Sequence, residues 1–103
     1  MRKRIYISGK ITGLDLKDAR DNFYDAAFTL WWNGYNPVNP MRETYFFNRI
    51  GKLPWCVYMF FDIILLLQCR GIYMQSNWRD SRGSRIEYRI AKFLNYESIF
   101  EER

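Results

Sequence analysis

Short β-rich runs alternate with longer segments of helical periodicity along this chain of 103 residues, and this alternation restricts the fold more than any other feature. The first run, residues 4–8, reads Arg-Ile-Tyr-Ile-Ser and stops at a glycine. Further strands are expected at residues 35–39, 70–75 and 98–100. Because a strand that returns after a helix usually lies parallel to the strand before it, the alternation predicts a parallel sheet with helices on both faces.

Three segments between these runs predict helices. The first begins after Asp15, a good N-cap residue, and stops at Asn33-Gly34. Its apolar residues recur at helical spacing: Leu16, Ala19, Phe23, Ala26, Ala27, Leu30 and Trp31. The other two helices are expected at residues 54–69 and 84–95. The predicted class is α/β, a flavodoxin-like or Rossmann-like three-layer sandwich with a short parallel sheet of about four to five strands.

Composition supports a folded chain with a single domain over residues 1–103. Nearly half of the residues are apolar (49%) and 19% are aromatic, which excludes intrinsic disorder. No linker or low-complexity tract divides the sequence. A chain of this length buries a smaller fraction of its surface than a larger domain, which favours self-association.

The net charge of +5 indicates a solvated basic surface or a small anionic ligand. Basic residues gather before the first strand and around residues 79–89. Aromatic residues do not alternate with them as in grooves that bind single strands, so we do not expect nucleic acid as a partner.

The chain has no histidine, which excludes Ser-His-Asp and Cys-His catalysis and His-ligated zinc. Its two cysteines, Cys56 and Cys69, lie on one predicted helix, about 20 Å apart, too far for a disulfide. They make no metal motif. With no signal peptide, we expect a cytoplasmic protein that needs no metal.

The segment from Trp55 to Leu67 is almost entirely apolar but contains Asp62. At about 13 residues it is too short to cross a bilayer, so no membrane association is expected. Its apolar surface exceeds what a thin sheet needs to bury. We therefore predict a homo-oligomer formed through this helix.

Residues 80–87 read Asp-Ser-Arg-Gly-Ser-Arg-Ile-Glu and connect the third strand to the third helix. Such a loop offers backbone N–H groups and a positive helix end to an anion. In a parallel sheet it meets the loops at residues 9–13 and 39–40 beyond the carboxyl ends of the strands. A structural alternative is a capping box, in which Glu87 bonds the backbone N–H of Ser84.

Three segments together resemble a known family. They are Ile-Tyr-Ile-Ser-Gly-Lys-Ile-Thr-Gly at residues 5–13, Tyr-Met-Phe-Phe-Asp-Ile at residues 58–63, and Asn-Trp-Arg-Asp-Ser-Arg-Gly-Ser-Arg-Ile-Glu at residues 77–87. In this order and spacing they resemble small bacterial and phage proteins related to nucleoside 2-deoxyribosyltransferases and deoxynucleoside 5′-monophosphate N-glycosidases. The resemblance spans nearly the whole chain and implies a nucleoside deoxyribosyltransferase-like fold.

The resemblance also implies three catalytic roles. Glu87 would attack C1′ of the deoxyribose and form a covalent intermediate, Tyr6 would lie against it, and Asp62 would assist the departing base. A carboxylate near a helix N-terminus is expected to stay ionised, as a nucleophile must. Ordinary strand packing is the alternative for Tyr6.

We expect the ligand to be a small nucleoside or nucleotide, with no cofactor. The expected substrate-binding residues are Gly9, Lys10, Gly13, Asn39, Ser81, Arg82, Gly83 and Ser84. Two other functions stay open at this stage, a nucleotide-binding module without turnover and an oligomeric interaction module.

Overall fold

The structure, a computed structural model, describes residues 2–11, 13–43 and 54–101. In this part of the chain, four strands form one parallel sheet in the order β2-β1-β3-β4. The strands are β1 (Arg4–Ser8), β2 (Asn36–Val38), β3 (Gly71–Met74) and β4 (Glu97–Phe100). Each lies within two residues of its predicted position, and the expected parallel sheet is confirmed.

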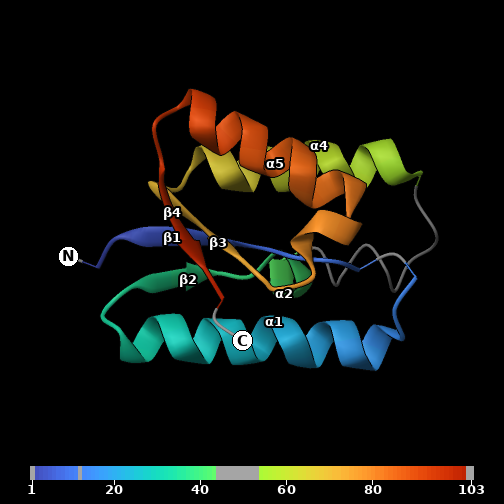
Figure 1. Ribbon diagram of the computed structural model, residues 1–103, viewed down its shortest axis with the longest axis horizontal. Helices are drawn as coiled ribbons and strands as arrows, with labels where there is room; N and C mark the ends of the chain where they lie inside the picture. Colours follow the sequence, from blue (N-terminus) through green and yellow to red (C-terminus); the bar gives the residue numbers. More distant parts are fainter. Residues whose placement is uncertain (1, 12, 44–53, 102–103) are drawn as a thin grey trace.

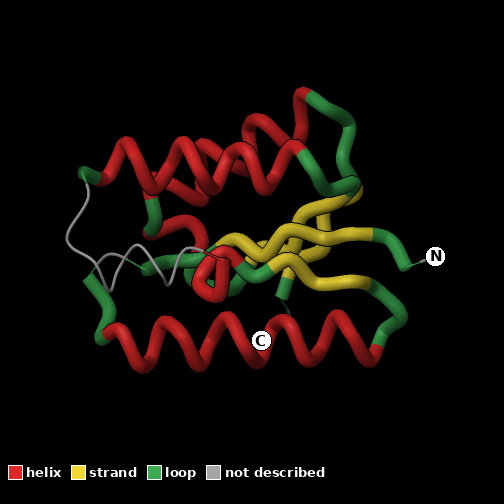
Figure 2. Tube along the Cα trace, turned by 180° about the vertical axis from the view of Figure 1, so that it is seen from behind, coloured by secondary structure: helices red, strands yellow, loops and turns green. Residues whose placement is uncertain are grey.

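Helices cover both faces of the sheet, which confirms the α/β sandwich. Figure 1 shows α1 (Leu16–Trp32) on one face and α4 (Trp55–Leu67) with α5 (Arg82–Phe93) on the other. The view from behind in Figure 2 shows the same three layers. Two short helices, α2 (Pro40–Glu43) and the 3-10 helix η1 (Trp78–Asp80), were not predicted.

Helix boundaries follow their caps. The Asp15 carboxylate accepts a hydrogen bond from the Lys17 backbone N–H and begins α1 as expected. The start of α5 was predicted two residues too late, because Ser81 and not Ser84 is its N-cap. The Ser81 Oγ accepts from the Ser84 backbone N–H at 3.2 Å, so Ser84 lies inside the first turn. The capping box is therefore wrong.

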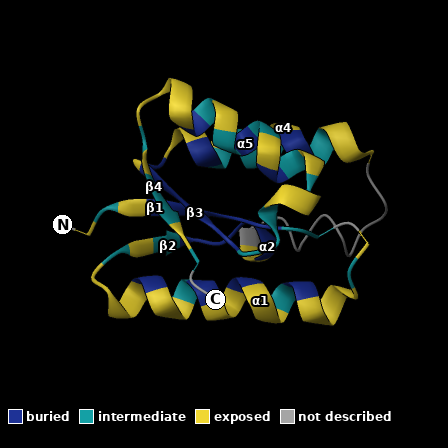
Figure 3. Ribbon diagram, in the orientation of Figure 1, coloured by how far each residue is buried: buried dark blue, intermediate teal, exposed yellow. Residues whose placement is uncertain are grey.

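Successive side chains of β1 point to opposite faces of the sheet, and the core accordingly consists of two clusters. Ile5 and Ile7 pack on the α1 side, with Phe23 and Leu30 among their neighbours. Tyr6 points to the other side, where the buried residues include Leu66, Ile72 and Ala91. Figure 3 shows β3 and most of β1 dark between the helical layers, since both faces of these two central strands are buried, while the edge strands β2 and β4 are more exposed.

The exposed surface departs from the predicted pattern in α1. Leu16 and Trp31 were expected on the apolar face, yet each is about half exposed. They lie in the first and last turns, where the helix extends beyond the short strands. Among the described residues, no helix combines the length and apolar character needed to span a bilayer.

Leu30→Ala should destabilise the fold far more than Leu16→Ala. Leu30 is 2% exposed within the α1 cluster, whereas Leu16 on the same helix is 50% exposed. We expect a loss of about 2–4 kcal/mol in the free energy of unfolding for the first and below ~1 kcal/mol for the second, measured by urea denaturation. Equal losses would contradict the assigned core.

Candidate functional site

A cavity of about 210 Å³ opens where the carboxyl ends of the strands meet the three loops expected to converge there. Its polar lining comes from distant parts of the sequence, since β1, α4 and α5 all contribute. The lining residues are Tyr6, Ile7, Gly9, Ile11, Phe23, Pro40, Met41, Trp55, Tyr58, Met59, Asp62, Ser81, Gly83, Ser84 and Glu87. The three residues expected to be catalytic thus share one cavity.

Two hydroxyl groups of β1 hold the Glu87 carboxyl group. The Tyr6 hydroxyl donates to Oε2 at 2.7 Å, and the Ser8 hydroxyl donates to Oε1 at 2.6 Å. Glu87 is 4% exposed and both hydroxyl-bearing residues are buried. Each carboxyl oxygen therefore has a fixed donor, and the group has one preferred orientation.

The local sequence explains this arrangement. Tyr6 and Ser8 are two residues apart on a strand, so their side chains lie on the same face of the sheet. Glu87 occupies the second turn of α5, which contacts β3 beside β1. Its carboxyl group consequently meets the sheet and takes no part in capping the helix.

The pKa of Glu87 is raised to about 8, mainly by burial and in addition by the nearby Asp62 charge. The hydrogen bonds from Ser8 and Tyr6 act in the opposite sense but do not compensate. Burial, followed by the Glu87 charge, also holds the pKa of the Tyr6 hydroxyl well above its usual range. The expectation that Glu87 stays ionised is therefore wrong at neutral pH, because desolvation outweighs the effect of the helix end.

Asp62 approaches the same cavity from α4. Burial raises the pKa of its carboxyl group to about 7. Two carboxyl groups with raised pKa values in one cavity repel each other when both are charged. They therefore titrate as a coupled pair, which retains protons at neutral pH.

The turn from Ser81 to Ser84 adds polar groups beside the carboxyl pair. The Ser84 hydroxyl is buried, lines the cavity, and has no hydrogen-bond partner among the described residues. A Cβ at Gly83 would lie 2.9 Å from the Met59 sulfur, so a larger residue would force the Met59 side chain to move. On this side of the cavity, the turn therefore presents the unsatisfied Ser84 hydroxyl, and its backbone at Gly83 lies close to Met59 of α4.

Comparison with known proteins assigns the chain to a family. The family model of the domain of unknown function DUF4406 matches residues 3–100. The chain belongs to this family. No curated protein and no solved structure matches it significantly.

Four expected binding residues of this DUF4406 chain do not line the cavity. The Lys10 backbone N–H donates to the Asn77 side chain, which ties the first loop to the end of β3, and Gly13 adopts a positive φ of 89°. The Asn39 side chain accepts from the Met41 backbone N–H and so begins α2. The Arg82 guanidinium lies 4.9 Å from the centre of the Trp55 ring, beside the cavity.

Ser8 and the apolar walls of the cavity were not predicted from the sequence. Period-two alternation with Tyr6 was the available signal for Ser8, although its partner lies 79 residues away. Trp55, Tyr58 and Met59 were read only as part of an apolar helix. Within the described ranges, no group of three or more acidic or cysteine side chains could hold a metal ion.

Glu87→Gln should flatten the dependence of stability on pH. The pKa of Glu87 is about 8 in the folded chain and returns toward its ordinary value of 4.5 on unfolding. Between these values the folded state binds more protons, so stability falls as pH rises. From pH 5 to pH 8, the parent should lose at least ~1 kcal/mol more than Glu87→Gln in urea denaturation.

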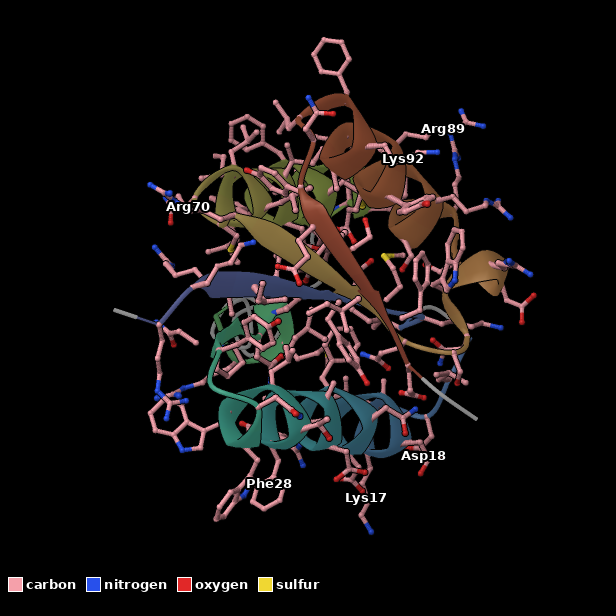
Figure 4. The ribbon with its side chains drawn as sticks, turned by 60° about the vertical axis from the view of Figure 1, so that its left-hand side comes forward. Lys17, Asp18, Phe28, Arg70, Arg89 and Lys92 are labelled. Atoms are coloured by element: carbon pink, nitrogen blue, oxygen red, sulfur yellow. The ribbon has the colours of Figure 1, made fainter. Side chains whose placement is uncertain are left out.

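Asp18→Asn, which removes an exposed carboxylate from α1 (Figure 4), provides the matched control and should keep the slope of the parent. Parallel pH profiles for the parent and Glu87→Gln would show that the carboxyl group is not desolvated as described.

Proposed function

We propose that this chain cleaves or transfers the N-glycosidic bond of a 2′-deoxynucleoside or its 5′-monophosphate. The observation that carries the proposal is the Glu87 carboxyl group, held by two hydroxyls in a cavity that Asp62 also lines. Retaining glycosyl chemistry uses such a pair of carboxyl groups. The resemblance of the three motifs to nucleoside 2-deoxyribosyltransferases supports the choice of a deoxyribosyl substrate.

In the first step, a carboxylate oxygen of Glu87 attacks C1′ and forms an ester bond to the sugar. The C1′–N bond breaks, its electron pair leaves with the base, and protonated Asp62 donates a proton to that base. The Tyr6 and Ser8 hydroxyls stay on the carboxyl group and fix its orientation. Asp62 suits this role because burial keeps its pKa near 7.

In the second step, a water molecule or the nitrogen of a second base attacks C1′ and releases Glu87 as a carboxylate. The proton of the incoming group passes to Asp62, which restores the starting state. No cofactor takes part. The proposal keeps the cytoplasmic location expected from the sequence, which the two free cysteines support.

The cavity walls suit the two halves of such a substrate. Trp55, Tyr58 and Met41 offer aromatic and apolar surface for a planar base. The buried Ser84 hydroxyl lacks a partner among the described residues, and a sugar hydroxyl or phosphate oxygen would supply one.

Ligand binding without turnover is the second candidate function. One observation favours it, because the raised pKa of Glu87 leaves its carboxyl group mostly protonated at neutral pH in the empty site. A protonated carboxyl group is a hydrogen-bond donor and a poor nucleophile.

Incubation of the protein with the common deoxynucleosides and their monophosphates should release free base, detected by liquid chromatography. Glu87→Gln should lower the rate by a factor of at least ~10³, because the amide cannot form the ester intermediate. The intermediate should appear in the parent as a deoxyribosyl adduct in intact-protein mass spectra.

Two controls separate the candidate functions. Glu97→Gln removes a carboxylate outside the cavity and should keep the parent rate. Stabilisation of the parent by a nucleotide, with no base released from any substrate, would contradict the enzyme and favour the binding module.

We also propose that two copies of the chain associate through the outer face of α4. Phe60, Ile64 and Leu67 are exposed there at helical spacing, and Asp62, the one charged residue of α4, faces the cavity. A chain of net charge +5 repels its copies, so an uncharged apolar face is the surface on which two copies meet with least repulsion. This contact would stabilise α4 on the side opposite the cavity.

Sedimentation velocity should show a dimer or larger assembly for the parent and a monomer for Phe60→Glu. Phe28→Glu is the matched control, since Phe28 is equally large and exposed but points outward from α1 (Figure 4). A monomeric parent, or dissociation by Phe28→Glu alone, would contradict the assignment of the interface to α4.

A further inference from the structure

A basic groove lies at the edge of the sheet opposite the candidate site, where β1 and β3 begin. Its volume is about 930 Å³, within the size range of ligand sites. The basic groove is lined by Arg2, Lys3, Arg4, Trp31, Asn36, Gln68 and Arg70. Among the described residues, four cationic side chains, two amides and one tryptophan line it, and no carboxylate does.

Two of the four cations already have partners inside the protein. The C-terminal ends of helices carry partial negative charge, and Arg2 donates to the Trp31 carbonyl oxygen in the last turn of α1. It also donates to the Tyr35 carbonyl oxygen, just beyond that helix. Its guanidinium also lies 3.7 Å from the centre of the Trp31 ring. Lys3 forms an ion pair with Glu97 at 2.6 Å. These contacts explain why the sequence carries Arg2 and Lys3.

Arg4 and Arg70 have no such explanation. They lie side by side at the starts of two hydrogen-bonded strands, since the Arg70 backbone N–H donates to the Arg4 carbonyl oxygen at 2.9 Å. Both are exposed, and neither forms a side-chain hydrogen bond or ion pair with another described residue. Figure 4 shows Arg70 extending away from the sheet. Like charges on adjacent strands are destabilising unless an anion lies between them.

We propose that Arg4 and Arg70 bind a phosphate-bearing anion in the basic groove. The planar guanidinium group matches two phosphate oxygens at once, and two adjacent guanidinium groups can hold one phosphate group from two sides. The Gln68 and Asn36 side chains flank the pair and add neutral donors.

The size of the basic groove favours an anion with more than one phosphate group. Arg2 lies in the same lining and extends the positive surface beyond the arginine pair, whereas the charge of Lys3 is paired with Glu97. A free oligophosphate and the backbone of a single-stranded nucleic acid share this chemistry.

This site is independent of the proposed catalysis. None of its lining residues lines the cavity that contains Glu87, and the two sites lie at opposite ends of the same strands. Failure of one proposal therefore leaves the other intact, and Glu87→Gln should bind the anion as the parent does.

Titration calorimetry of the full chain with tripolyphosphate, and fluorescence anisotropy with a labelled single-stranded oligonucleotide, test the site. Arg4→Gln and Arg70→Gln should each weaken binding about tenfold, the effect of losing one charge-assisted contact. If the oligonucleotide binds, the double variant should also reduce the slope of log K against log salt by about 1.4, because two phosphate contacts are lost.

Arg89→Gln is the matched control, since it removes one exposed positive charge from α5, outside the basic groove (Figure 4). It should change binding less than about twofold. Tripolyphosphate binding without oligonucleotide binding supports the site and identifies a free oligophosphate, and the reverse result identifies a nucleic acid. The proposal is overturned if neither probe binds, or if Arg89→Gln weakens binding as much as Arg4→Gln and Arg70→Gln.

Discussion

The rest of the structure depends on the two hydrogen bonds that join Glu87 to β1. The fully buried residues of α5 are Ser84, Glu87 and Ala91, and two of these three are polar. Tyr88 and Ile90 of the same helix are half-buried and pack against the core. Apolar packing therefore acts together with the Glu87 carboxyl group, which needs both the Tyr6 and Ser8 hydroxyls because an unsatisfied buried carboxyl group is costly. The contact that docks the helix is thus also the contact that orients the candidate nucleophile.

The protonation of Glu87 limits the proposed chemistry without excluding it. With a pKa of about 8, ionising the carboxyl group at pH 7 costs ~1.4 kcal/mol, a factor of about ten in the reactive population. Enzymes lower barriers by about 8–23 kcal/mol, so this cost is small. A substrate that displaces water and bonds the Ser84 hydroxyl changes the surroundings of both carboxyl groups, and Asp62 must then hold the proton that Glu87 gives up.

Patterns within one segment predicted most of the fold, whereas contacts between segments decided the details of the site. Alternation of strands and helices gave the parallel sheet, and Asp15 marked the start of α1. Ser81 and Ser84 are equally good caps in sequence, and they are distinguished by the hydrogen bond from the Ser84 backbone N–H to the Ser81 hydroxyl and by the burial of Ser84 against the cavity. Asn39 follows β2 at the expected edge of the sheet, but its side chain accepts from the Met41 backbone N–H and does not line the cavity. Such choices depend on neighbours that a linear pattern does not contain.

Helix α4 presents a different chemistry on each side, and this restricts how its length can vary. Asp62 faces the cavity, Leu66 packs in the core, and Phe60 lies on the outer surface. Each residue advances a helix by about 100°, so inserting or deleting a single residue between positions 60 and 66 would rotate part of this pattern away from the rest. Homologous chains should therefore conserve the number of residues in this helix more strictly than the apolar residues themselves.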